Sequence, residues 1–337
     1  MKLYIILTIL LTLGAALTPF VSVFNHEKPQ AVQTEQFEPE SESAAEKALE
    51  KEPDTSPATI KVLRTGSGKI VEKEIFEYVK GAVAAEMPPT YEKEALKAQA
   101  VACYTYALWL KENSESFDVS GADVSDSPIY HQGFLDDDEL RDKWGEKFEE
   151  YMTAISEAVS AVIGEYLEYN GEPIMACYHS ISTGKTESAE NAWGTDVPYL
   201  QSVRADGDIL SPDIDSSITL SDEQFREAAQ ALEGAELSEN SKEWVKKPDA
   251  TDSGYVTKIS IGSKEFSGSD VRSAFSLKSP AFTIKKTEKG FLFSVKGYGH
   301  LVGMSQYSAD YMARQGSDYK DILLHFYKGA TLKKSQA

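Results

Sequence analysis

The hydrophobic pattern opens with an apolar run over residues 3–24, preceded by a single lysine, Lys2. A run of that length can cross a hydrocarbon core about 30 Å thick. A cleaved signal peptide has a shorter apolar stretch that ends at small residues, whereas further apolar residues follow Ala15 and Ala16. The pattern therefore favours a signal anchor, a single transmembrane helix over residues 1–25, with a cleaved signal peptide as the alternative. Both place the rest of the chain outside the cytoplasm.

Residues 26–58 break this pattern and have the composition of a linker. They carry nine acidic residues against three lysines, and few large apolar side chains. Such a segment buries too little apolar surface to offset the entropy that ordering it would cost. We expect a disordered, acidic and flexible linker that separates a folded domain from the membrane.

The strongest helical periodicity lies on either side of a pair of prolines. Apolar positions recur at helical spacing over 75–85, and 91–111 is rich in Ala, Leu, Lys, Glu and Gln. Pro88 and Pro89 end the first helix, because proline disfavours the helical conformation of the residue before it. Glu86 is therefore predicted to lie at the bend between two helices, where its side chain is held in place and can reach a groove.

The remaining pattern mixes short strands and helices over residues 59–335. Asn170-Gly171 is a strong hairpin signal. We predict strands at 59–63, 71–75, 166–169, 174–182, 256–261, 282–286 and 292–296. We predict further helices at 139–164, at 222–232, around Trp244, at 305–314 and at 318–326. Because regular strand–helix–strand alternation is absent from the sequence pattern, the predicted class is α+β, with mixed helices and antiparallel strands forming a groove. Residues 206–280 are a candidate subdomain.

Composition narrows the classes of partner. The chain has 34 basic and 54 acidic residues and a formal net charge of −20. Because binding to phosphates needs an excess of Lys and Arg, nucleic acid is not expected as a partner, and broad electrostatic binding to anionic lipid is disfavoured. The two cysteines, Cys103 and Cys177, are interpreted as small buried thiols, with one disulfide as the alternative.

Three segments of the sequence contain candidate catalytic or ligand-binding residues, among them glycine, histidine, lysine and acidic residues. The first runs from Val83 to Pro88 and continues through Glu94 to Ala102. The second comprises Tyr178–Ser180, Gly184–Glu187, Pro198–Leu200 and Val203. The third comprises Gly297–His300, Val302–Gln306, Ala309 and Ile322–Tyr327. In this order and spread, the segments resemble the stage II sporulation protein D family. The resemblance covers residues 59–335.

That resemblance implies a specific activity and setting. The family's members are peptidoglycan lytic transglycosylases that act during engulfment in spore-forming bacteria. They cut between N-acetylmuramic acid and N-acetylglucosamine and leave a 1,6-anhydro product, on strands stripped of peptide by an amidase. The implied partners are peptidoglycan glycan strands and the stage II sporulation proteins P and M. From the sequence, we expect neither a cofactor nor a metal. The implied location is the cell membrane, with the catalytic domain in the septal space outside the cytoplasm.

The family's catalytic glutamate corresponds to Glu86. A glycosidase needs an acid that protonates the leaving oxygen and a base that then accepts a proton. A hydrolase usually adds a second carboxylate about 5 to 9 Å away, whereas a lytic transglycosylase uses the sugar's own C6 hydroxyl as nucleophile. The motif contains apolar neighbours and no second carboxylate, which favours a raised pKa for Glu86 and a transglycosylase.

The candidate substrate-binding residues come from all three segments. They are Lys97, Tyr178, His179, Lys185, Tyr199, His300 and Gln306. Lys97 could instead be a solvated helix residue, and the two tyrosines could belong to the core. The sequence departs from the family at Tyr104, where an arginine is common, and at Leu301, where a glycine is common.

Two other chemistries have weaker support. Cys177 and His179 share one face of a predicted strand, but a thiol nucleophile needs an orienting third group or a helix N-terminus. A metal site from His131, Cys103, Cys177 and His179 lacks recognisable ligand spacing. The alternative function is a non-catalytic, glycan-binding enhancer of an amidase.

Overall fold

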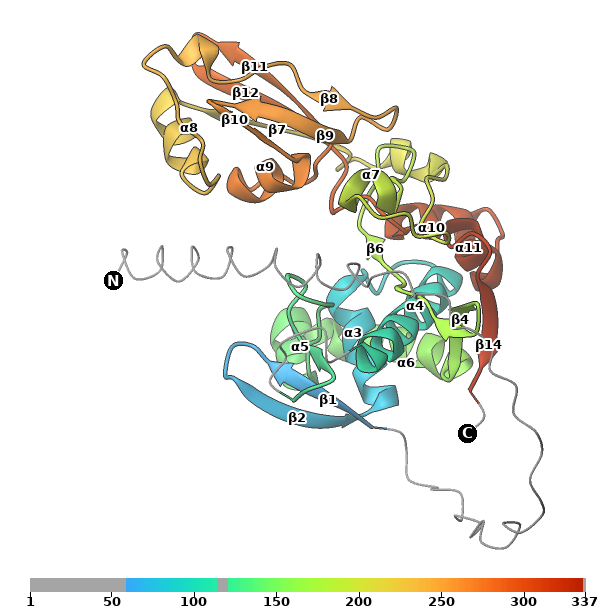
Figure 1. Cartoon of the computed structure of the whole chain (residues 1–337). Helices are drawn as coiled ribbons and strands as arrows, with labels where there is room; N and C mark the ends of the chain where they lie inside the picture. Colours follow the sequence, from blue (N-terminus) through green and yellow to red (C-terminus); the bar gives the residue numbers. More distant parts are fainter. Residues whose placement is uncertain (1–58, 114–120, 336–337) are drawn as a thin grey trace, which may run out of the picture.

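A computed structural model describes residues 59–113 and 121–335 (Figure 1). The predicted anchor over residues 1–25 and the linker over 26–58 lie outside the described residues. Across the described part of the chain, every helix is too short or too polar to cross a membrane. The structure mixes helices with several small sheets, as predicted, and its buried apolar residues form two large clusters and one small one.

The first lobe begins with a small sheet. Strand β1 (Thr59–Arg64) pairs antiparallel with β2 (Lys69–Glu74) and parallel with the short β3 (Val124–Ser125). Alternate residues of β1 are buried, among them Ile60 and Val62, which join the larger core. The first two predicted strands are therefore confirmed.

The predicted bend between two helices is present. Helix α3 (Ile75–Glu86) ends where Met87 turns to an extended conformation, and Pro88 follows. Helix α4 (Lys93–Glu112) then begins, and the Glu92 N–H donates to Asp310 Oδ1 at 2.7 Å. That bond ties the start of α4 to the later helix that contains Asp310. The bend therefore lies between the end of α3 and this fixed start of α4.

The helix predicted over 139–164 is two helices. Helix α5 (Asp137–Trp144) ends at Gly145, whose positive φ of 53° stops the helical run, and one 3-10 turn follows. Helix α6 (Phe148–Val162) then packs its apolar face against α3 and α4. The sequence pattern missed the break because apolar spacing continues across it.

The strand predicted over 174–182 is wrong for most of its length. The hairpin at Asn170-Gly171 is confirmed, joining β4 (Glu165–Tyr169) to β5 (Glu172–Pro173). Beyond it, the Cys177 N–H donates to the Met175 carbonyl, a local turn that takes the backbone out of the ladder. Only β6 (Tyr178–His179) is a strand, and it pairs parallel with β13 (Met304–Ser305).

The second lobe has its own apolar core. It contains β7 (Asp215–Leu220), α8 (Asp222–Ala229), β8 (Asp249–Ala250), β9 (Val256–Ile261), β10 (Lys264–Phe266), α9 (Gly268–Ala274), β11 (Phe282–Thr287) and β12 (Gly290–Lys296). Two three-stranded sheets, β11-β12-β7 and β10-β9-β8, enclose a cluster of phenylalanines with Trp244. The predicted helix around Trp244 is a three-residue 3-10 turn, Ser241–Glu243. This core extends past residue 280, through β12.

The chain returns from the second lobe to the first. Helices α10 (Gln306–Arg314) and α11 (Tyr319–Phe326) pack on α4, and β14 (Thr331–Lys334) pairs with β4 (Figure 1). Helix α7 (Ala189–Trp193) lies near the junction, beneath the second lobe in this view. The returning segment brings the third sequence motif beside the second.

The carboxylate of Glu187 joins the two lobes, because each of its oxygens accepts two hydrogen bonds. Its Oε1 accepts from the Ser188 N–H and the Asn191 amide at 2.9 Å, and its Oε2 accepts from the Thr251 and Ser253 hydroxyls at 2.6 and 2.5 Å. Burial disfavours the charge, but these four hydrogen bonds outweigh it and lower the pKa of Glu187.

We expect Glu187→Gln to lower the free energy of unfolding by about 1 to 3 kcal/mol, because the hydroxyl donors lose a charged acceptor. Since the folded pKa is depressed, the carboxylate's contribution is present above the ordinary glutamate pKa and is lost as pH falls through the folded value. Urea unfolding at neutral and acidic pH checks this, with the exposed Glu190→Gln as the control. An equal effect of both variants would contradict the prediction.

Candidate active site

The side chain of Glu86 projects from the last residue of α3 into a half-buried position. Its Oε1 accepts a hydrogen bond from the backbone N–H of Gly133. Burial raises the pKa of Glu86, while the Gly133 bond and the positive charge of Lys143 act in the opposite direction. The net result is a carboxyl group that holds its proton to a higher pH than an ordinary glutamate.

Lys143 is a site residue that sequence analysis missed. It lies on the exposed side of α5, and its Nζ donates to the Ala84 carbonyl of α3 at 3.4 Å. Nothing in the sequence links residues 84 and 143, because only the packing of α5 brings them together. The lysine whose charge lowers the pKa of Glu86 is Lys143.

Gln132 is the second residue that was missed. Its side chain is buried and makes three hydrogen bonds: Nε2 donates to Tyr78 Oη at 2.7 Å and to the Cys103 carbonyl at 3.1 Å, and Oε1 accepts from Tyr178 Oη at 2.9 Å. Because Gln132 precedes Gly133, these bonds also fix the N–H that reaches Glu86. A β-carbon on Gly133 would lie 2.8 Å from Glu86 Oε1, so glycine is needed for this close approach.

Side chains of α4 connect Gln306 to Tyr178, and Gln132 connects Tyr178 to the segment that bonds Glu86. Gln306 Nε2 donates to Gln99 Oε1 at 3.3 Å, and Gln99 Nε2 lies 3.3 Å from Cys103 Sγ, which lies 3.6 Å from Tyr178 Oη. Tyr178 then bonds to Gln132 as above. Two predicted site residues, Tyr178 and Gln306, thus belong to one polar network beside Glu86.

Backbone groups of two segments hold the ring of His300. Its Nδ1 accepts from the Val302 N–H at 3.1 Å, and a hydrogen bond to the backbone of Tyr178 holds the ring as well. Burial is the largest of several effects that lower its pKa to about 3. The ring is therefore neutral and fixes β6 against the loop of the third motif. The ring also packs against His179 and Trp193, with 5.8 Å between the ring centroids of each pair.

His179 is buried on β6. Its Nδ1 lies 3.0 Å from the Val302 carbonyl, so this nitrogen carries the proton, and Nε2 has no hydrogen-bond partner among the described residues. Burial lowers its pKa to about 4. Next to it, Leu301 is buried at a positive φ of 70°, a conformation that favours glycine. Leucine therefore occupies a left-handed backbone position where the resemblance led us to expect glycine.

The other three predicted binding residues make contacts outside the network around Glu86 or are exposed. Lys97 pairs with Glu94 at 2.6 Å and lies over the ring of Tyr319 at 5.6 Å. Tyr199 Oη accepts from the Met175 N–H at 3.1 Å, and its ring packs on the main core. Lys185 is exposed. Their roles in binding stay predictions. Tyr104, the other departure from the family, is a buried core residue.

Both cysteines are free thiols, so the disulfide alternative is excluded. Burial raises the pKa of Cys103 and of Cys177 to about 12, which leaves both protonated at neutral pH. A Cys177–His179 nucleophile is therefore unsupported. Within the described ranges, no group of three or more His, Cys, Asp or Glu side chains could hold a metal.

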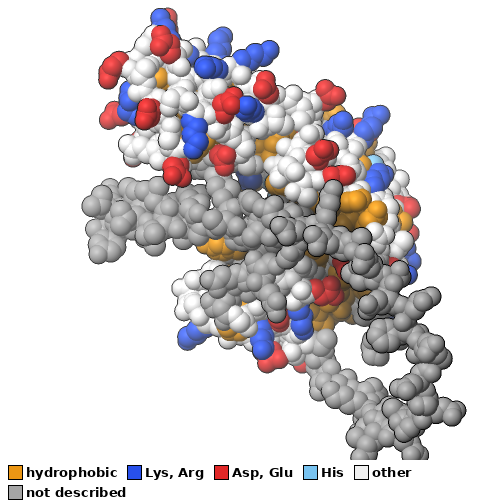
Figure 2. Space-filling model, in the orientation of Figure 1, with side chains coloured by type: hydrophobic (Ala, Val, Ile, Leu, Met, Phe, Trp, Pro, Cys, Tyr) orange, Lys and Arg blue, Asp and Glu red, His pale blue; other side chains and the backbone are white. Residues whose placement is uncertain are grey.

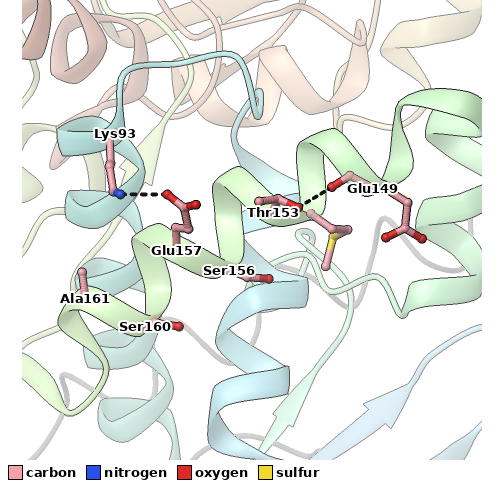
Figure 3. Close-up of a pocket in the computed structure, with 8 residues that line it drawn as sticks. Lys93, Glu149, Thr153, Ser156, Glu157, Ser160 and Ala161 are labelled. Carbon is pink, nitrogen blue, oxygen red and sulfur yellow. Dashed lines mark hydrogen bonds and ion pairs between the residues drawn. The ribbon is translucent and has the colours of Figure 1, made fainter.

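A hollow beside α6 is chemically unlike this site (Figure 3). It is lined by Lys93, Glu149, Met152, Thr153, Ser156, Glu157, Ser160 and Ala161. Lys93 pairs with Glu157 at 2.9 Å, and the Thr153 hydroxyl donates to the Glu149 carbonyl of its own helix (Figure 3). None of the predicted site residues lines it.

Fold and site together define a class: a mixed α/β protein with two cores, whose helix–helix bend holds one half-buried carboxyl group. Residues 64–169 match the SpoIID family of stage II sporulation proteins. The chain is 32% identical to stage II sporulation protein D of Bacillus subtilis (strain 168) over 95% of this chain and 92% of that protein. Against the protein of that name from Bacillus amyloliquefaciens, the identity is 34% with the same coverage. The chain belongs to the stage II sporulation protein D family.

A third relative has a different name. The amidase enhancer of Bacillus subtilis (strain 168) is 29% identical, over 75% of this chain and 40% of that protein. The family match over residues 64–169 contains Glu86, Gln132, Gly133 and Lys143, and ends before the second lobe begins. The site around Glu86 is thus built mainly from the matched region.

Proposed function

We propose that the chain is a peptidoglycan lytic transglycosylase in which Glu86 is the acid and base. The observation that carries the proposal is a half-buried carboxyl group with a raised pKa, held by the Gly133 N–H. Among the described residues, no second carboxylate contributes to that shift. A hydrolase usually needs such a partner, and a lytic transglycosylase does not.

The two oxygens of Glu86 have different tasks in this mechanism. Oε1 accepts from Gly133, so the proton resides on the other oxygen, Oε2. Oε2–H donates its proton to the glycosidic oxygen between N-acetylmuramic acid and N-acetylglucosamine as the C1–O bond breaks. The resulting carboxylate then takes the proton of the muramic acid C6 hydroxyl, whose oxygen bonds to C1. The products are a 1,6-anhydro end and a free N-acetylglucosamine end, and Glu86 is protonated again.

Membership of the family supports a proposal for the setting as well. We propose a location at the cell membrane with the catalytic lobes in the septal space during engulfment. The substrate is a glycan strand, free of peptide, lying in a groove between the lobes. Partners would be the stage II sporulation proteins P and M. These assignments are supported by the relatives' names in sporulation and by the apolar N-terminal run.

Mass spectrometry of digested glycan tests the activity. Purified strands incubated with the protein should yield fragments that end in 1,6-anhydro-N-acetylmuramic acid. Reducing ends without the anhydro mark would indicate a hydrolase instead. Intact strands after long incubation would overturn the proposed activity.

The alternative is a glycan-binding enhancer of an amidase, which the similarity to the amidase enhancer favours. An enhancer has no need of a carboxyl group with a raised pKa. If Glu86→Ala bound glycan and stimulated an amidase as well as the parent does, with no anhydro product from either, this alternative would hold.

The pH profile of turnover tests the role of Lys143. Because the acid form of Glu86 starts the reaction, the rate should fall as pH rises through its pKa. Lys143 lowers that pKa, so Lys143→Met should raise it and move the alkaline limb of kcat/KM to higher pH. The exposed Lys147→Met is the matched control and should leave the limb in place. A shift to lower pH in Lys143→Met would contradict this electrostatic role.

A further inference from the structure

Arg272, in the last turn of α9 in the second lobe, is a half-buried cation without a counterion. Among the described residues, its guanidinium makes no hydrogen bond or ion pair. Burial is the main cause that lowers the pKa of this guanidinium, so the charge is not fully solvated. A charge withdrawn from water without a partner costs free energy, and a bound anion would offset that cost.

The loop of the third motif lies against the end of α9. The Leu277 N–H donates to the Arg272 carbonyl at 2.9 Å, and the Gly299 N–H donates to the Lys278 carbonyl at 3.0 Å. Lys278 Nζ lies over the ring of Tyr298 at 5.4 Å. Tyr298 is 47% exposed. A second cation and a solvent-facing aromatic ring therefore lie on the segment that follows Arg272.

Helix α7 borders the same place from the other side. Tyr255 Oη is 2.8 Å from Ser269 Oγ of α9 and 3.5 Å from the Ala192 carbonyl of α7. The next residue of α7, Trp193, packs its ring 5.8 Å from that of His300. The charge of Arg272 acts on His300 and on His179, which places the three groups in one cluster. His179 adds a buried Nε2 with no partner in the described chain.

The acidic side chains of the surrounding elements are already engaged. On α9 itself, Asp270 accepts from the N–H and hydroxyl of Ser267 at 3.0 and 2.8 Å. Asp208 accepts from the Ser182 N–H and the Ser305 hydroxyl, both at 2.7 Å. Glu187 has the four donors described above. Because none of these carboxylates forms a hydrogen bond or ion pair with Arg272, its guanidinium is the charged group that an anion from outside can reach.

Strand β6 connects this cluster to the catalytic carboxyl group. The Tyr178 side chain belongs to the network around Glu86, while its backbone bonds to His300 and the next residue, His179, is in the cluster. Figure 1 shows α9 on the side of the second lobe that is nearer α3. Strand β6 therefore borders both the network around Glu86 and the cluster that contains Arg272.

We propose that Arg272 binds the lactyl carboxylate of a peptide-free muramic acid residue, in a subsite separate from the bond that Glu86 cleaves. Guanidinium matches a carboxylate with two parallel hydrogen bonds, and Lys278 is a second cation on the segment that follows α9. In strands that carry peptides, this carboxylate is consumed in an amide bond. Arg272 therefore makes the second lobe selective for stripped strands. The inference rests on the proposed function for the identity of the ligand.

Binding is measured in a Glu86→Gln background, so that cleavage does not interfere. The chain with and without Arg272→Gln is titrated with three probes: peptide-free strands, the same strands with carboxylates reduced to alcohols, and peptide-bearing strands. We expect Arg272→Gln to weaken binding of peptide-free strands about 10- to 100-fold. The reduced strands should bind both proteins equally weakly, and Arg272→Lys should recover part of the affinity. The exposed Arg204→Gln is the matched control and should behave like the parent.

Several results would overturn the inference. Unchanged affinity for peptide-free strands in Arg272→Gln would do so, as would an equal loss on the reduced strands. A loss confined to peptide-bearing strands would assign the carboxylate to the peptide instead. A lower melting temperature in Arg272→Gln would indicate a structural role, since removing an unpaired charge should hold or raise it. If the binding results were as expected but the parent protein cleaved no glycan, the proposed function would be wrong and the Arg272 subsite would stand.

Discussion

Replacing Glu86 with glutamine should reduce formation of the anhydro product by about 10²- to 10⁴-fold, the range that general acid–base catalysis contributes. Glutamine has the size of glutamate, and its amide oxygen can still accept from the Gly133 N–H. It cannot donate a proton to the leaving oxygen or accept one from the C6 hydroxyl. Both chemical steps are therefore lost while the position of the side chain is kept.

The same substitution should stabilise the protein at neutral pH. The folded-state pKa of Glu86 is raised, so the contribution of this group to stability is fully present below the ordinary glutamate pKa and is lost as pH rises through the folded value. Above that value the parent keeps a carboxylate in a half-buried site, whereas glutamine is neutral throughout. The melting temperature of Glu86→Gln should exceed that of the parent at neutral pH, and the gap should close in acid.

Two measurements on one pair of proteins check this: product formation by mass spectrometry and thermal unfolding across pH. The exposed Glu146→Gln is the control for a lost negative charge and should change neither. Full activity in Glu86→Gln would remove Glu86 from the mechanism. Lost activity together with lost stability would instead mean that Glu86 holds the fold.

The position of Glu86 could be predicted because its causes are local. Prolines at 88 and 89 end α3, and an alanine- and leucine-rich segment begins α4, so the bend follows from adjacent residues. The hairpin at Asn170-Gly171 follows from its turn in the same way. For these two features, the neighbours in sequence were sufficient, whereas the break at Gly145 was masked by apolar spacing that continues across it.

The surroundings of Glu86 could not be predicted because they depend on packing. Gly133 and Lys143 reach α3 from segments about fifty residues further along, and neither has a local signature. The strand predicted over 174–182 was wrong at residues 174–177 for another reason. Apolar residues indicate burial, and a buried segment need not pair with a neighbouring strand. His300 was found through its motif, but its two backbone bonds are visible only in three dimensions.

Gln132 is the residue whose loss should most affect stability. Gln132→Met keeps nearly the same volume but leaves Tyr78 Oη, Tyr178 Oη and the Cys103 carbonyl without their amide partner. Each buried polar group left without its bond costs about 1 to 3 kcal/mol, so we expect a loss of about 3 to 5 kcal/mol in unfolding free energy. Urea unfolding checks this, with the exposed Gln315→Met as the control.

Activity should fall in Gln132→Met as well, through the position of Glu86. Gln132 and Gly133 are adjacent, so a shift of this segment weakens the backbone bond to Oε1 and lets the carboxyl group rotate. Because that bond lowers the pKa of Glu86, weakening it should also move the alkaline limb of kcat/KM to higher pH. Tyr178→Phe removes only one hydrogen bond to Gln132 and should show a smaller loss of stability with the limb unmoved. A limb that stays in place in Gln132→Met, at a temperature where the variant is folded, would show that Gln132 supports the core and does not position the acid.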